Sequence, residues 1–363
     1  MKNLKSLLKY AFLVVFAVGI IACDNDDSDS DSTPTISYLE HLTNMSENVI
    51  VKTYEDLSGK GAALFNEAKN FQNNKSAATL DQVKQAWRSA RQPWEQSEGF
   101  LYGPVDTKGI DPAIDSWPVN VVDMDALLAD TVNHPTITEA VVDAQVDEAK
   151  GFHLIEYLLW GIDGNKQVAD FSDRELEYLV AACENLKNKT NTLHISWATN
   201  EENYVANFTN FGVSYEYSAE KNALEDIVTG MIAIADEVGN GKIEAPLNGE
   251  DGSGVDPSQE ESRFSHNSKI DFSNNMKSIA NIYNGKYYND GKGISDVIAS
   301  ENATLDATFR QEIIDAIDAI DAIPGTFTDA IQNNRSVVED AQEKVRTVQA
   351  TLESEIKPLI SSL

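Results

Sequence analysis

Apolar residues recur at steps of three and four along most of the chain, and this spacing constrains the fold more than any other feature. The pattern covers 37–57, 79–97, 139–160, 173–197 and 216–238, and it returns in 309–323 and 337–360. Such spacing places apolar side chains on one face of an α-helix, whereas the two-residue alternation typical of strands is rare here. We therefore predict an all-α protein built from amphipathic helices.

The length after the N-terminal region suits two helical bundles. Roughly 330 residues follow residue 35, enough for two ordinary domains. Residues 155–161 and 279–285 are weakly alike, since each ends an apolar helical run at a glycine after a long loop. This similarity favours a duplicated design. We place the predicted domains at 36–200 and 201–363.

The first 22 residues have the pattern of a bacterial secretory signal. Three lysines precede the apolar run 11–21, which is too short to span a bilayer as a stable helix. The run ends in Gly-Ile-Ile-Ala-Cys, which resembles a lipobox. We predict a signal peptide over 1–22, lipidation of Cys23, and attachment to a membrane of the cell envelope, with the outer membrane as the expected place.

Acidic residues dominate the segment that follows the predicted lipidation site. Residues 23–35 are rich in Asp and Ser and offer no apolar side chain to a core, so we predict a disordered tether. It resembles the acidic tags of some surface lipoproteins, although a plain solvated spacer explains it equally well. The formal charge of the whole chain is -31, which disfavours binding to nucleic acid.

The segment 151–161, Gly-Phe-His-Leu-Ile-Glu-Tyr-Leu-Leu-Trp-Gly, sets His153 and Glu156 three residues apart within an apolar helical run. That spacing places both side chains on one helix face. An imidazole and a carboxylate held together in apolar surroundings can ligate a metal or exchange a proton. The alternative is that the two groups only hydrogen-bond each other, or nearby backbone, inside a core.

The motif Gly-x-His-x-x-Glu followed by Tyr-Leu-Leu-Trp-Gly resembles the signature of the imelysin-like family, also called the M75 peptidase family. That family includes iron-regulated surface and periplasmic proteins. Further similar segments lie at 87–106, 115–118, 261–265 and 271–285, so the resemblance covers most of the chain after residue 36. It implies two four-helix-bundle domains, with His153 and Glu156 contributing to a metal or active site in the cleft between them.

Other polar residues of the similar segments are candidates to complete this site. We expect Glu98 as a third metal ligand, although it is equally compatible with a solvated helix end. Arg91, Asp115 and Ser265 are expected in the same cleft. Arg91 suits a carboxylate partner, in a structural or a binding role, and Asp115 is also a candidate for an Asx turn.

Three functions remain compatible with these residues. The first is a lipid-anchored envelope protein that binds a metal ion, expected to be iron with zinc as an alternative, and contributes to iron uptake with other envelope proteins. The second is an M75-type metallopeptidase, although the chain lacks the His-Glu-x-x-His motif of conventional zinc peptidases. The third is a module that binds a peptide or haem, in which the His-Glu pair is structural. Whether the protein is an enzyme stays open.

Overall fold

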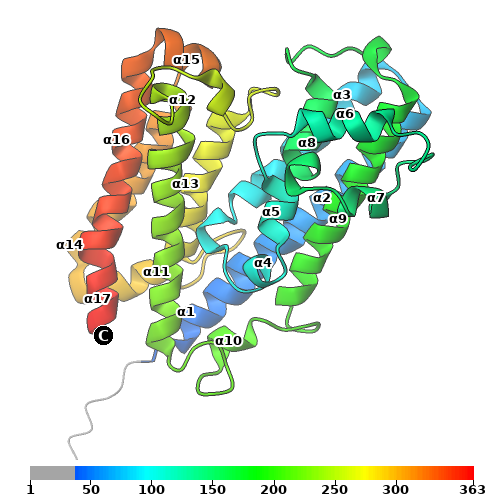
Figure 1. The fold of residues 1–363 in the computed structure, drawn as a ribbon. Helices are drawn as coiled ribbons and strands as arrows, with labels where there is room; N and C mark the ends of the chain where they lie inside the picture. The colour runs from blue at the N-terminus through cyan, green and yellow to red at the C-terminus, as the bar shows by residue number, and fades with distance from the viewer. Residues whose placement is uncertain (1–36) are drawn as a thin grey trace, which may run out of the picture. The chain divides into compact units, whose positions relative to one another are not determined.

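The computed structural model describes residues 37–363, and every regular element in this range is a helix (Figure 1). This confirms the all-α prediction. None of the described helices is both long and apolar enough to cross a membrane. The predictions on the signal peptide, Cys23 and the acidic tether lie outside the described residues.

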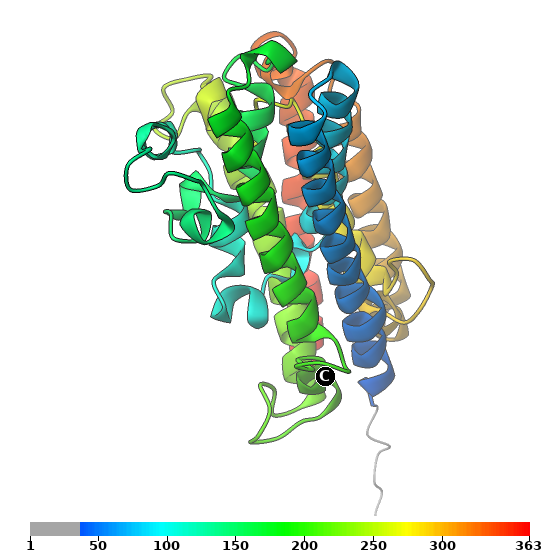
Figure 2. The same cartoon turned by 90° about the vertical axis from the view of Figure 1, so that its right-hand side faces the viewer.

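Helices from the first half of the chain pack chiefly with one another. They are α2 (Val51–Asn73), α3 (Ala77–Glu95), α8 (Gly151–Trp160) and α9 (Asp173–Trp197). The long helix α2 lies along both α3 and α9, and α8 packs against α9 and α3. Figure 2 shows α2 and α9 side by side over most of their length. A π-helical segment, η1 (Met45–Ile50), joins α2 to the first helix, α1 (Leu39–Asn44).

Helices from the second half form a second group. The long ones are α11 (Glu220–Asp236), α13 (Ser268–Asn284), α14 (Ile294–Asp321) and α16 (Arg335–Thr351). Shorter ones are α10 (Ala206–Thr209), α12 (Glu244–Asn248), α15 (Phe327–Asn333) and α17 (Lys357–Ser362). Helix α14 packs against α13 and α16, and α11 contacts α13, α16 and α17. The domain boundary near residue 200 stays a prediction.

The two groups meet where α13 packs against α3 and where α11 packs against a 3-10 turn, η2 (Glu98–Phe100), that follows α3. Gly230 makes the second contact possible, because a Cβ at this position would collide with the carbonyl oxygen of Gly99. The glycine therefore lets α11 approach the end of α3 closely.

Side-chain caps begin two of the long helices of the first group. Ser76 precedes α3 and Ser172 precedes α9, and each accepts a hydrogen bond from the backbone N–H three residues later. Glu175 completes a capping box at the start of α9, because its side chain accepts a hydrogen bond from the backbone N–H of Ser172 at 2.8 Å. Caps of this kind satisfy backbone donors that the first helical turn leaves free.

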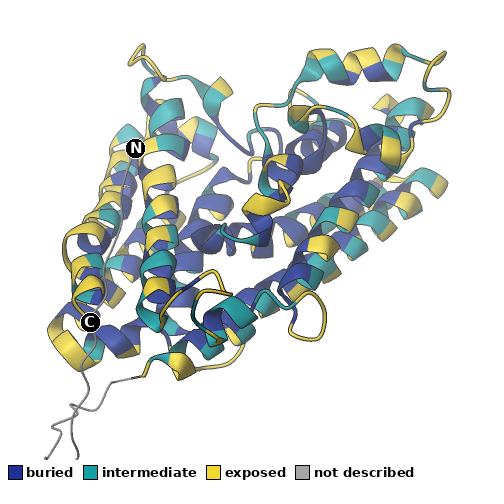
Figure 3. Cartoon of the chain, turned by 60° about the horizontal axis from the view of Figure 1, so that its bottom comes forward, coloured by how far each residue is buried: buried dark blue, intermediate teal, exposed yellow. Residues whose placement is uncertain are grey.

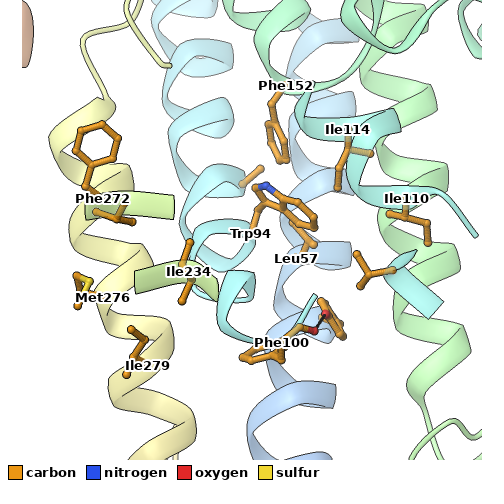
Figure 4. Close-up of a cluster of buried hydrophobic side chains, with 14 of the residues drawn as sticks. Leu57, Trp94, Phe100, Ile110, Ile114, Phe152, Ile234, Phe272, Met276 and Ile279 are labelled. Atoms are coloured by element: carbon orange, nitrogen blue, oxygen red, sulfur yellow. Dashed lines mark hydrogen bonds between the residues drawn. The ribbon is translucent and has the colours of Figure 1, made fainter. Parts of the chain in front are cut away.

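Large apolar side chains fill the space between the helices. Figure 4 shows the indole of Trp94 between Leu57, Ile114 and Phe152, and all four residues are buried. Exposed residues lie mainly on the outward faces of the helices (Figure 3). Burying one such large side chain stabilises the fold by about 1.5–3 kcal/mol.

Short helices occupy the stretch between α3 and α8, and the predicted helical run 139–160 is divided between the last of these and α8. They are α4 (Pro104–Thr107), α5 (Ile110–Asp115), α6 (Val121–Ala129) and α7 (Glu139–Asp143). Helix α5 packs against α8 and so lies next to the His-Glu motif.

Candidate metal centre

A cluster of buried charged side chains lies where the two helix groups meet. Among residues 37–363 it contains Arg91, Glu95, Glu98, Asp115, His153, Glu156, Lys242, Glu261 and Asp271. We call this set the buried charge cluster. Its six carboxylates outnumber its two permanent cations, and a protonated histidine would not restore balance. Charge buried without a counter-charge is expensive, so the cluster needs protons or a further cation.

Gly151 brings the His-Glu motif to the cluster. Its φ of +74° is one that residues with a Cβ rarely adopt, and a Cβ there would collide with the carbonyl group of Ile114. The start of α8 therefore rests directly on the end of α5. His153 consequently lies beside Asp115, the last residue of α5.

The two ring nitrogens of His153 face different partners. Nδ1 lies 3.3 Å from Oε2 of Glu156, as the spacing in the sequence predicts. Nε2 lies 3.2 Å from Oδ1 of Asp115 and 3.7 Å from Oε1 of Glu261. Neither contact of Nε2 has the alignment of a hydrogen bond, so this buried nitrogen has no hydrogen-bond partner among the described residues.

Glu156 fixes the orientation of this imidazole. Its second oxygen, Oε1, accepts the backbone N–H of Ser265 at 2.7 Å. Arg88 of α3 holds the same loop by donating to the carbonyl oxygen of Ser265 at 2.8 Å. Ser265 therefore reaches the site through its backbone, and Glu156 lies on the opposite side of the imidazole from Asp115 and Glu261.

Asp115, His153 and Glu261 form a triad with the spacing of metal ligands. Each offers one ligand atom, and the three atoms lie within 4.8 Å of one another. The donor set is one imidazole nitrogen and two carboxylate oxygens, a set that iron, manganese and zinc accept. The fit is supported by two buried atoms that lack hydrogen-bond partners, Nε2 of His153 and Oε2 of Glu261.

Glu98 belongs to a neighbouring group of carboxylates that Lys242 contacts. Glu95, Glu98 and Asp115 also offer oxygens within 4.8 Å of one another. Nζ of Lys242 lies 3.0 Å from Glu98 Oε2 and 3.2 Å from Glu261 Oε1. The ammonium group thus contacts one member of the triad and one member of this group, and Asp115 belongs to both. Glu98 stays a predicted ligand, although it forms no ion pair with His153 in the described part of the chain.

Arg91 binds carboxylates from both halves of the chain. It is fully buried and forms ion pairs with Glu95 and Asp115. It also lies 3.0 Å from Glu261 and 3.6 Å from Asp271. These partners come from α3, α5, the loop before α13 and α13 itself. Arg91 therefore links four segments of the chain through ion pairs.

Asp115 is held by a further donor. Nε1 of Trp94 donates to Oδ2 of Asp115 at 2.6 Å, while Oδ1 faces Arg91 and His153. The two oxygens therefore have separate partners. This arrangement fixes the orientation of the Asp115 carboxylate, which belongs both to the triad and to the group with Glu95 and Glu98.

The electrostatics of the cluster follow from burial and from these ion pairs. Burial raises the pKa of Glu98 well above its ordinary value, and Glu95 adds to the effect. Burial, only partly offset by Arg91, raises the pKa of Asp271 to about 6. Burial opposes the charged form of His153, but the carboxylates of Asp115, Glu156 and Glu261 outweigh it and raise its pKa. Without a metal the cluster therefore retains protons.

Sequence reasoning missed four members of the cluster: Glu95, Lys242, Glu261 and Asp271. Glu95 stands four residues after Arg91, a spacing that favours an ion pair on a helix. Lys242 lies in a π-helical segment, η5 (Glu237–Lys242), which widens the end of α11. Segments of this type are frequent at functional sites but leave no periodicity in the sequence.

The model of the imelysin peptidase M75 family matches residues 50–355. The chain belongs to the imelysin family. It is 28% identical to iron-regulated protein A of Synechococcus elongatus over 322 residues, which cover 86% of this chain and 84% of the relative. This finding confirms the resemblance drawn from the His-x-x-Glu motif and its neighbours.

Solved structures of the imelysin family share the fold. A proposed iron-regulated protein A precursor from Parabacteroides distasonis matches with a TM-score of 0.80 and 27% identity, covering 92% of this chain and 96% of that protein. An imelysin-like protein from Psychrobacter arcticum matches with a TM-score of 0.70 and 14% identity, over 90% and 97% of the two chains.

Proposed function

We propose that this imelysin-family protein binds one metal ion, iron, through the triad of Asp115, His153 and Glu261, and thereby contributes to iron uptake at the cell envelope. One observation carries the proposal. A buried imidazole nitrogen without a hydrogen-bond partner faces two carboxylates, inside a cluster with more carboxylates than cations. A bound cation would satisfy both the nitrogen and the charge.

The proposal assigns separate roles to the residues around the metal. Asp115 and Glu261 supply charged oxygens, and His153 supplies a neutral nitrogen. Glu156 holds the imidazole through Nδ1, the arrangement by which carboxylates commonly orient metal-bound histidines. The bound ion would supply positive charge and open coordination positions for water.

Iron is proposed because of the relatives, and the envelope location because of the N-terminal sequence. Two of the similar proteins carry the name iron-regulated protein A. Residues 1–22 have the signal-peptide pattern, and Cys23 follows the lipobox-like run. Lipidation at Cys23 would anchor the protein to the outer membrane, where other uptake proteins are the proposed partners.

Metal binding is better supported than peptide hydrolysis. A cavity beside His153 and Glu261 has a volume of about 10 Å³. This is room for about one water molecule, whereas the pocket lined by Asp115 measures about 250 Å³. Metal binding is supported by the spacing of the three ligand atoms, whereas peptide hydrolysis is supported by the family name alone.

The test is a metal titration of the full chain in detergent with ferrous, ferric, manganous and zinc ions, followed by elemental analysis. We expect one iron per chain, and none in the His153→Ala variant. His194→Ala is the control, because His194 lies on α9 outside the cluster. A wild-type protein that retains none of these ions, or a His153→Ala variant that retains iron as well as the control, would refute the proposal.

A further inference from the structure

An open pocket of about 250 Å³ lies next to the triad. Its wall includes Glu98, Asp111, Asp115, Trp117, Glu237 and Lys242. Asp111 and Asp115 stand four residues apart on α5, so they lie on one face of this helix. Glu237 and Lys242 begin and end η5. The pocket therefore lies between a short helix of the first group and the π-helical end of α11.

The pocket leads to the proposed metal ligands. Asp115 lines it and is also a member of the triad. Oδ1 of Asp115 lies 3.2 Å from Nε2 of His153, the buried nitrogen without a hydrogen-bond partner. A cation that crosses the pocket thus meets the first ligand at its wall and the second immediately behind it.

The charge of the wall is negative. Four carboxylates face one ammonium group, and Lys242 is already engaged with Glu98 at 3.0 Å and Glu237 at 3.6 Å. The Asp111 side chain forms no hydrogen bond or ion pair with any residue of 37–363, although the residue is partly buried. Its carboxylate is therefore available to a cation from solution.

We infer that this pocket is the entrance to the metal site and that it admits iron as a hydrated cation, while excluding anionic iron chelates and haem. The inference rests on the proposed function and names the form in which the metal arrives. Carboxylate-lined clefts raise the local concentration of cations and repel anions. A ferric carboxylate chelate or a haem with its propionates would meet repulsion at Asp111 and Glu237.

The volume of the pocket agrees with this selection. An octahedral ion with six waters, at about 30 Å³ for each water, needs roughly 180 Å³. Pockets that enclose larger organic ligands usually measure about 300–1,000 Å³. A pocket of about 250 Å³ therefore accommodates the hydrated ion and is too small to enclose a porphyrin.

The first experiment measures the rate at which ferrous ion associates with the full chain under anoxic conditions, by stopped flow. The double variant Asp111→Asn, Glu237→Gln should associate about tenfold more slowly than wild type, with a weaker dependence on salt concentration. Asp315→Asn, Asp318→Asn is the matched control, because it removes two charges from the exposed face of α14. The control should keep the wild-type rate.

The salt dependence of the wild-type rate is a second measurement that needs no variant. An entrance lined by carboxylates predicts that association slows as salt is added. A rate that does not change with salt, or an entrance variant as fast as the control, would overturn the inference while leaving metal binding intact.

The second experiment compares ferrous ion with ferric citrate and haemin as the added probe. We expect stoichiometric ferrous binding and no retention of intact ferric citrate or haemin after gel filtration. Retention of either anionic complex in wild type, lost on substitution of Trp117 by alanine, would show that the pocket holds a chelate and would refute the exclusion. Failure of every probe to bind would instead refute the proposed function.

Discussion

Replacing Glu156 with glutamine should weaken metal binding and leave the fold intact. The two oxygens of Glu156 have partners of different kinds. Oε1 accepts from the backbone N–H of Ser265 at 2.7 Å, and Oε2 lies 3.3 Å from Nδ1 of His153. A backbone N–H can only donate, so the carbonyl oxygen of the glutamine must stay on Ser265. The amide nitrogen must then face the imidazole.

This exchange reverses the polarity of the contact with His153. An amide NH₂ can only donate, so Nδ1 must accept, and a neutral imidazole then carries its proton on Nε2. That nitrogen is the one that faces Asp115 and Glu261. A metal would have to displace this proton and force the imidazole into its other tautomer.

The expected cost is a 10- to 100-fold loss of metal affinity, typical of changes to groups that orient a ligand, or roughly 1.4–2.8 kcal/mol. Rotating the glutamine amide by 180° does not avoid a cost. The amide nitrogen would then point at the N–H of Ser265, and leaving that buried donor without an acceptor costs about 1–3 kcal/mol of folding stability.

Calorimetric titration with ferrous ion and zinc, together with thermal unfolding of the metal-free protein, measures both quantities. Glu260→Gln is a matched control. Glu260 is equally buried, but its carboxylate accepts from the hydroxyl groups of Ser268 at 2.7 Å and Thr328 at 2.6 Å. Hydroxyl groups can donate or accept, so this variant should bind metal normally. Wild-type affinity in a folded Glu156→Gln protein would refute the assigned role of Glu156.

Three further predictions concern the motif, its protonation and the anchor. Gly151→Ala should lower the free energy of unfolding by roughly 2–5 kcal/mol in chemical denaturation, because it adds left-handed backbone strain to a collision with Ile114. If Gly151→Ala unfolds like wild type, the close approach of α8 to α5 is not needed. Metal uptake should release a proton, because neighbouring carboxylates raise the pKa of His153 and its imidazole must become neutral to bind. Affinity should therefore rise with pH up to that pKa, and titrations in buffers of different ionisation enthalpy should reveal the released proton; identical heats would contradict this. Cys23→Ser should release the protein from membranes, and a variant that still sediments with them after a high-salt wash would show that the anchor is elsewhere.

The helices and one pair of the site were predictable from the sequence because both depend on local spacing. Three- and four-residue periodicity located α3, α9, α11 and α16 but not α13, and the three-residue step from His153 to Glu156 placed their side chains in contact. Short helices such as α5 have too few turns for a period to show. The position of Asp115 beside His153 is therefore visible only once α5 packs on α8.

The partners of the site residues were harder to predict because they are distant in the chain. Glu98 meets Lys242 across 144 residues, and Glu156 meets Ser265 across 109. No local pattern indicates that Lys242 contacts Glu98, or that Glu261 lies on the Nε2 side of His153. Both facts follow from the packing of α13 against α3 and of α11 against η2.

The three residues of the triad come from both halves of the chain, so a bound ion would affect the stability of the fold. Asp115 and His153 come from the first half of the chain, and Glu261 comes from the second. One ion bound by all three would act as a removable crosslink between segments more than a hundred residues apart. An ion that binds only the folded chain adds about 2.7 kcal/mol to its stability when present at 100 times its Kd. The metal-free form would then unfold more often than the iron-bound form. In a cell short of iron, envelope proteases would therefore degrade the protein faster.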